Sequence, residues 1–265
     1  MPHVQTNRLR IYYEIHGSGE PLVLIRGLGS ACDSAPQLVE KLADSLRVLS
    51  FDNRCVGLTD QPQQSFTVAD MADDTAALMD ALKVESAHVL GISLGGMIAQ
   101  ELALRHPQKV RRLALACTHA GVRTCVRSPA WASQIFNEAS EMPRPEARRH
   151  SVPILFSRKT IRERPDIIEE MLQTAMNNNQ SKASYLLQLG AALTHDTYDR
   201  LHEVKRRTLV LTGAEDVLID PGNSRLIAER IPGARLVEFE ETGHVFFLER
   251  VDEVSRALID FFQGE

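Results

Sequence analysis

Short apolar runs alternate with stretches of helical periodicity along residues 1–118. Strand-like runs occur at residues 9–15, 21–25, 47–51, 87–92 and 110–117. The run at 21–25 has no polar face, which is typical of a strand buried on both sides of a parallel sheet. Between the runs, apolar residues recur with helical spacing in residues 35–45, 67–82 and 94–105, and Thr67 is placed to cap the second of these helices.

The alternation stops near residue 121 and resumes near residue 200. The interval has no clear strand, but it contains helical segments at residues 166–177 and 182–193. Beyond it, strand-like runs at 208–212 and 234–239 alternate with helical stretches at 224–230 and 251–262. Alternating strands and helices predict an α/β fold in which helices cover both faces of a parallel sheet. The helical interval is then an insertion over one edge of that sheet.

Composition narrows the class of protein. With 265 residues, 43% of them apolar and 25% charged, the chain is typical of a globular enzyme with a large core. Its net charge of -5 argues against nucleic acid as the main partner, because phosphate binding requires a basic surface. The N-terminal segment has no basic stretch followed by an apolar run, so no secretory signal is expected. No apolar run reaches roughly 18 residues, so no membrane span is expected. The four cysteines form no metal-binding pattern, so reduced thiols and a cytoplasmic location are expected.

The sharpest chemical signal is Gly91-Ile92-Ser93-Leu94-Gly95, a G-x-S-x-G sequence. The bare pattern also occurs by chance in loops, but here it joins a predicted strand to a predicted helix, as a nucleophile elbow requires. In such a turn the serine hydroxyl points out of the sheet, and the helix N-terminus favours developing negative charge. Ser93 is therefore the predicted nucleophile.

A serine hydroxyl needs a base, and the base needs an orienting carboxylate. With this type of elbow the chain order is serine, then acid, then histidine. Asp216 and His244 each follow a strand-like run, and sites in α/β sheets collect at the carboxyl ends of strands. The competing acids are Glu215 and Asp220, of which Asp220 is better placed to cap the next helix. Asp216 and His244 are the predicted partners of the nucleophile.

Stabilisation of an oxyanion needs two backbone N–H donors. Leu94, the residue after the nucleophile, supplies one. We expect the second from Leu28, in the loop Arg26-Gly27-Leu28-Gly29, whose glycines allow a close approach of the backbone. The alternative is that this loop is only a flexible turn.

Taken in order, these motifs resemble the α/β-hydrolase superfamily over essentially the whole chain. The matching segments are residues 26–29, 51–62, 91–96, 213–216 and 242–244, and residues 194–201 resemble the return from the helical cap of that family. The branches that the chain resembles are the 3-oxoadipate enol-lactonase-like enzymes, the esterases and the cofactor-free perhydrolases. The resemblance implies an eight-stranded, mostly parallel sheet, a core of residues 1–118 and 204–265, and a helical cap of residues 119–203 above the site.

The cap also implies a substrate site, for which Met97, His119, Trp131 and His195 are the candidate lining residues, with plain packing as the alternative. The chain departs from the family pattern at two positions. Arg26 replaces the usual histidine of the first motif, where it either attracts an anionic substrate or caps the strand end. Cys55 replaces the usual glycine of the second motif, so the backbone is strained if that position has a positive φ.

Together these residues predict a serine hydrolase that cleaves a carboxylic ester or lactone of a small molecule through an acyl-enzyme. This chemistry needs no metal and no organic cofactor. A thioesterase, a C–C bond hydrolase or a perhydrolase would keep the same triad. Outside catalysis, the rivals are a small-ligand receptor on the same scaffold and a plain interaction module. The sequence leaves substrate identity and assembly into a homo-oligomer open.

Overall fold

The computed structural model describes residues 2–174 and 180–264, and its centre is an eight-stranded sheet in the order β1-β2-β4-β3-β5-β6-β7-β8. β1 and β2 pair antiparallel, as do β2 and β4, whereas all pairs from β4 to β8 are parallel. The strands are β1 (His3–Gln5), β2 (Arg10–His16), β3 (Glu20–Ile25), β4 (Leu46–Phe51), β5 (Ala87–Ile92), β6 (Val110–Ala116), β7 (Thr208–Gly213) and β8 (Arg235–Phe239). The predicted α/β class is confirmed.

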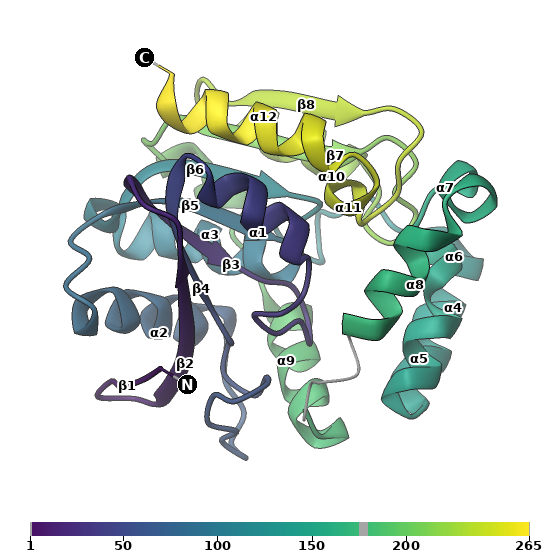
Figure 1. Ribbon diagram of the computed structural model, residues 1–265, viewed down its shortest axis with the longest axis horizontal. Helices are drawn as coiled ribbons and strands as arrows, with labels where there is room; N and C mark the ends of the chain where they lie inside the picture. The colour runs from purple at the N-terminus through teal and green to yellow at the C-terminus, as the bar shows by residue number, and fades with distance from the viewer. Residues whose placement is uncertain (1, 175–179, 265) are drawn as a thin grey trace.

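Helices cover both faces of this sheet (Figure 1). One face carries α1 (Pro36–Ala43), the short α11 (Phe246–Glu249) and α12 (Val251–Gln263), and the other carries α2 (Val68–Ala81), α3 (Leu94–Arg105) and α10 (Gly222–Arg230). Along β3, Leu22 and Leu24 join the core on the first face, and Val23 and Ile25 join the core on the second. Because successive side chains of a strand point to opposite faces, both must be apolar, which explains the run without a polar face.

A group of helices between β6 and β7 forms the insertion that the sequence predicts. It consists of α4 (Ala130–Glu141), α5 (Arg144–His150), α6 (Val152–Leu155), α7 (Arg158–Glu163), α8 (Pro165–Thr174) and α9 (Lys182–Thr194). Figure 1 shows α4 to α8 gathered beside the sheet. The limits 119–203 stay a prediction, and residues 175–177 of the predicted helix 166–177 lie outside the described residues.

The predicted elements differ from the observed ones mainly at their ends. Thr67 caps α2 as expected: its side chain accepts a hydrogen bond from the N–H of Asp70, whose carboxylate accepts one from the N–H of Thr67. β6 ends at Ala116 rather than at 117, because Cys117 has a φ of 39° and leaves the strand conformation. The three-residue β1 was not predicted, since so short a strand has no readable period. Among the described residues, no helix combines the length and apolarity that crossing a membrane requires.

Candidate active site

Ser93 lies in a sharp turn between β5 and α3. Its backbone angles are φ 55° and ψ −118°, which a residue with a side chain rarely adopts. The turn requires glycine on both sides, because a Cβ at Gly91 would lie 2.3 Å from the carbonyl oxygen of Gly95. A Cβ at Gly95 would lie 2.0 Å from the carbonyl oxygen of Ile25. The strand and the helix therefore pass as closely as the nucleophile elbow requires.

The loops after β7 and β8 bring Asp216 and His244 together. Nδ1 of His244 lies 2.8 Å from Oδ2 of Asp216, and the two side chains are 7% and 0% exposed. The other carboxylate oxygen of Asp216 accepts hydrogen bonds from the N–H groups of Leu218 and Ile219, each at 2.9 Å. With Nδ1 donating to this fixed carboxylate, the Nε2 of His244 is the nitrogen that can accept a proton.

The competing acid Asp220 has a different partner. Its Oδ1 accepts a hydrogen bond from the N–H of Gly222 at 2.8 Å, at the start of α10. Asp220 therefore satisfies a backbone donor at a helix start, as its sequence position suggested, and Asp216 is the acid that contacts His244.

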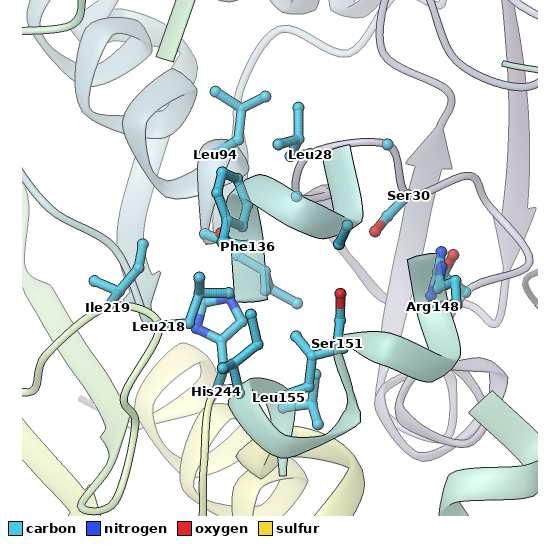
Figure 2. Close-up of a pocket in the computed structure, with 18 of the residues that line it drawn as sticks. Leu28, Ser30, Leu94, Phe136, Arg148, Ser151, Leu155, Leu218, Ile219 and His244 are labelled. Atoms are coloured by element: carbon cyan, nitrogen blue, oxygen red, sulfur yellow. The ribbon is translucent and has the colours of Figure 1, made fainter. Parts of the chain in front are cut away.

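Ser93 and His244 line one cavity of about 1460 Å³ between the sheet and the cap helices. Leu28 and Leu94 line it too, and Figure 2 shows them above the imidazole of His244. Leu94 is the first residue of α3, so its N–H has no acceptor within the helix. A Cβ at Gly27 would lie 3.2 Å from the Cβ of Ser93, which places the loop that carries Leu28 directly against the nucleophile. Both predicted oxyanion donors thus belong to segments that border the serine.

The wall of the cavity is mostly apolar. The cap contributes Phe136 and Leu155, and the loop after Asp216 contributes Leu218 and Ile219 (Figure 2). Polar and charged side chains, among them Arg148 and Tyr185, line other parts of the wall. A concave site with both apolar surface and polar groups is typical of a binding site for a small organic molecule. Within residues 2–174 and 180–264, no group of three His, Cys, Asp or Glu side chains is arranged to hold a metal ion.

Of the predicted lining residues, the structure places Met97 and His119 in the cavity wall. Burial lowers the pKa of His119 to about 4, so its imidazole is neutral at pH 7, and its Nδ1 accepts a hydrogen bond from the N–H of Gly121. Trp131 and His195 lie outside that wall. Trp131 is 45% exposed on α4, because the helix turns this position towards solvent.

His195 is buried instead in the packing behind His119. It is 5% exposed, and its Nε2 lies 3.2 Å from the hydroxyl of Thr197. Burial lowers the pKa of His195 to about 3, and the nearby His119 makes a smaller contribution in the same direction. The packing role that the sequence left as an alternative therefore applies to His195.

The two departures from the family pattern have structural explanations. The Arg26 side chain is 2% exposed and donates hydrogen bonds to the carbonyl of Cys32 and the hydroxyl of Ser50, at 2.9 and 3.3 Å. These contacts favour a structural role over attraction of a substrate at the mouth. Cys55 has a φ of 67°, so this position does have the positive φ that strains any residue but glycine.

Sequence reasoning missed the residues that connect the cap to the catalytic loops. The Glu249 carboxylate accepts hydrogen bonds from the N–H of Gly243, at 2.7 Å, and from the N–H and hydroxyl of Ser157, at 3.1 and 2.8 Å. Gln188 of α9 accepts a hydrogen bond from the N–H of Gly29 at 3.0 Å. Neither residue belongs to a motif, so no pattern in the sequence could have identified it.

The chain was compared with protein families, curated proteins and solved structures. A model of the α/β-hydrolase fold family matches residues 20–251. The putative carbamate hydrolase RutD of Azorhizobium caulinodans is 29% identical over 98% of this chain and 98% of its own length. The putative non-heme bromoperoxidase BpoC of Mycobacterium tuberculosis is 30% identical over 96% of this chain and 98% of its own. The enol-lactonase of Burkholderia xenovorans LB400 superposes with a TM-score of 0.86, at 26% identity over 98% of this chain and 99% of that one.

Proposed function

Because this chain belongs to the α/β-hydrolase fold family, we propose that it is a serine hydrolase that cleaves a carboxylic ester or lactone of a small molecule. One observation carries the proposal. His244 lines the same cavity as the elbow serine Ser93, and its imidazole is joined at 2.8 Å to the buried carboxylate of Asp216 behind it. A nucleophile, a base and an orienting acid at one cavity are the groups that acyl transfer requires.

The proposed reaction has two halves. In the first, the Ser93 hydroxyl oxygen attacks the substrate carbonyl while Nε2 of His244 takes its proton and then gives it to the leaving oxygen. In the second, His244 takes a proton from water, the resulting hydroxide attacks the acyl-enzyme, and Ser93 recovers its proton. The N–H groups of Leu28 and Leu94 donate hydrogen bonds to the oxyanion in both halves. Asp216 holds the imidazole in position and stabilises its cation.

The choice of ester or lactone is supported by the enol-lactonase among the similar structures and by the apolar wall of the cavity. A carbamate hydrolase also attacks an acyl carbon, so that relative agrees with an acyl-transfer site. Thioesters, C–C bonds and peracid formation would use the same groups. A panel of 4-nitrophenyl esters, lactones and thioesters separates these activities by comparing kcat/KM on the purified protein.

The decisive experiment uses 4-nitrophenyl hexanoate and a fluorophosphonate probe on the wild type and three variants. Ser93→Ala should lose both turnover and labelling, and Asp216→Asn should lower kcat by about 10⁴-fold, because the imidazole loses its orienting acceptor. Ser65→Ala, at an exposed serine far along the chain from the site, is the control and should behave as wild type. Full turnover in Ser93→Ala, or a label on another residue, would rule out the proposed nucleophile.

A further inference from the structure

Two arginines of the cap helix α5 lie in the wall of the cavity. Arg144 is bound into the structure: its guanidinium donates hydrogen bonds to the side-chain oxygen of Gln180, at 2.9 Å, and to the carbonyl of Gly29 in the predicted oxyanion loop. Its Nε is nevertheless buried without a hydrogen-bond partner. Arg144 is thus held against the loop of Gly29, and its Nε does not face the open space of the cavity.

Arg148, one helical turn further along α5, has no such anchor. It lines the cavity, where Figure 2 shows it across from Ser30 and Ser151, and it makes no hydrogen bond or ion pair to any residue in the described part of the chain. Burial and the neighbouring Arg144 lower its pKa to about 10, so the guanidinium is still fully charged at pH 7. Among the residues that the structure describes, this positive charge therefore has no partner.

The charges around Arg148 do not neutralise it. Arg144 is a like charge and Tyr185 is uncharged at neutral pH. Asp33 interacts favourably with Arg148 but forms no ion pair with it among the described residues. By contrast, two other cations that line the cavity have acidic partners, Lys182 with Glu141 and Arg164 with Asp166. A half-buried cation without a partner is costly for the free protein, and an anionic ligand removes that cost.

We propose that Arg148 binds a carboxylate of the substrate, so that the enzyme acts on esters or lactones that carry a second, ionised acid group. This inference rests on the proposed serine hydrolase function. A planar guanidinium matches the two oxygens of a carboxylate, and the apolar part of the cavity wall accommodates a hydrocarbon chain. Arg148 is thus a specificity-determining residue that no motif of the chain indicates.

The test compares two esters that differ only at the far end of the acyl chain. Mono-4-nitrophenyl adipate carries a terminal carboxylate, and 4-nitrophenyl hexanoate of the same length carries a methyl group. Wild type should have the higher kcat/KM on the adipate ester. Arg148→Gln should lower that value by about 10-fold to 100-fold, the range supplied by a hydrogen-bonded charge pair, and leave the hexanoate ester within about twofold.

Two further variants sharpen the result. Arg148→Lys keeps the charge but not the planar fork, so it should recover part of the loss on the adipate ester. Arg149→Gln removes an exposed neighbour on the same helix, whose partner is Glu169, and should leave both esters unaffected. Unchanged activity on the hexanoate ester also shows that the variants are folded. Equal losses on the two esters, or none on the adipate ester, would overturn the inference.

A binding measurement separates this inference from the proposed function. In the Ser93→Ala background, calorimetry gives the dissociation constant of mono-4-nitrophenyl adipate without turnover. If neither ester is hydrolysed by the wild type but adipate binding still depends on Arg148, the hydrolase proposal fails and the carboxylate site stands. If the hexanoate ester is hydrolysed and adipate binding does not respond to Arg148→Gln, the site fails and the hydrolase proposal stands.

Discussion

Glu249 links the loop of His244 to the cap, and we expect Glu249→Ala to reduce both stability and turnover. The carboxylate accepts three hydrogen bonds, one from the N–H next to His244 and two from Ser157 at the start of α7. Ser157 is 2% exposed, and Gly243 is also buried, so water replaces this acceptor poorly. A second contact holds the same loop, since the N–H of Val245 donates to the carbonyl of Leu155 at 3.0 Å.

The expected loss of stability in Glu249→Ala follows from the hydrogen-bond donors that lose their acceptor. The Ser157 hydroxyl can turn to Thr160, whose Oγ1 lies 3.1 Å away, so only the two backbone N–H groups lose their acceptor. An unsatisfied buried donor costs about 1–3 kcal/mol, which gives an expected loss of about 2–4 kcal/mol after partial relaxation. Because His244 follows Gly243 directly, kcat should also fall, by up to about 100-fold for a displacement on the order of 1 Å. Glu249→Gln keeps one oxygen acceptor and should give intermediate losses.

Urea unfolding at pH 7 measures the free energy, and hydrolysis of 4-nitrophenyl hexanoate measures kcat on the same samples. Glu253→Ala, which removes an exposed acid one turn away, is the control and should change stability by less than about 0.5 kcal/mol. If Glu249→Ala unfolds at the same urea concentration as wild type, the carboxylate does not hold the loop. A stability loss with unchanged kcat would show that it anchors the cap without positioning His244.

The other predictions concern the pH dependence of stability and the effect of a side chain added at a glycine. The pKa of His195 is about 3 in the folded protein against about 6.5 unfolded, so the unfolded state binds the proton first and stability falls as the pH drops below 6.5. Urea titrations should therefore show that His195→Gln loses less free energy of unfolding between pH 6.5 and pH 4 than wild type does. The exposed-site control His202→Gln should behave as wild type, and equal losses in the two variants would refute this. Gly190→Ala, with nothing within 4 Å of the added Cβ, should stabilise α9 by about 0.5–1 kcal/mol. Gly95→Ala, by contrast, should abolish soluble or active protein, and normal activity would contradict the elbow packing.

The candidate site could be located from sequence because each of its three proposed catalytic residues stands at a recognisable junction. Ser93 follows a strand and opens a helix, and Asp216 and His244 follow later strands of the same sheet. Parallel strands place their carboxyl ends at one edge of the sheet, so the three residues lie at that edge whatever the cap does. The failures, Trp131 and His195, are on cap segments, where no sheet fixes which way a side chain faces.

The sequence by itself determined the α/β alternation, the elbow and the junctions at which Ser93, Asp216 and His244 stand, because periodicity and turn chemistry act over a few residues. Only the tertiary structure decided what surrounds them. The contacts of Gln188 with Gly29 and of Glu249 with Ser157 join residues 159 and 92 positions apart, and the exposure of Arg148 to the cavity depends on how α5 packs. Packing of helices against one another is set by the whole chain, so the shape and charge of the cavity appear only once the cap is in place.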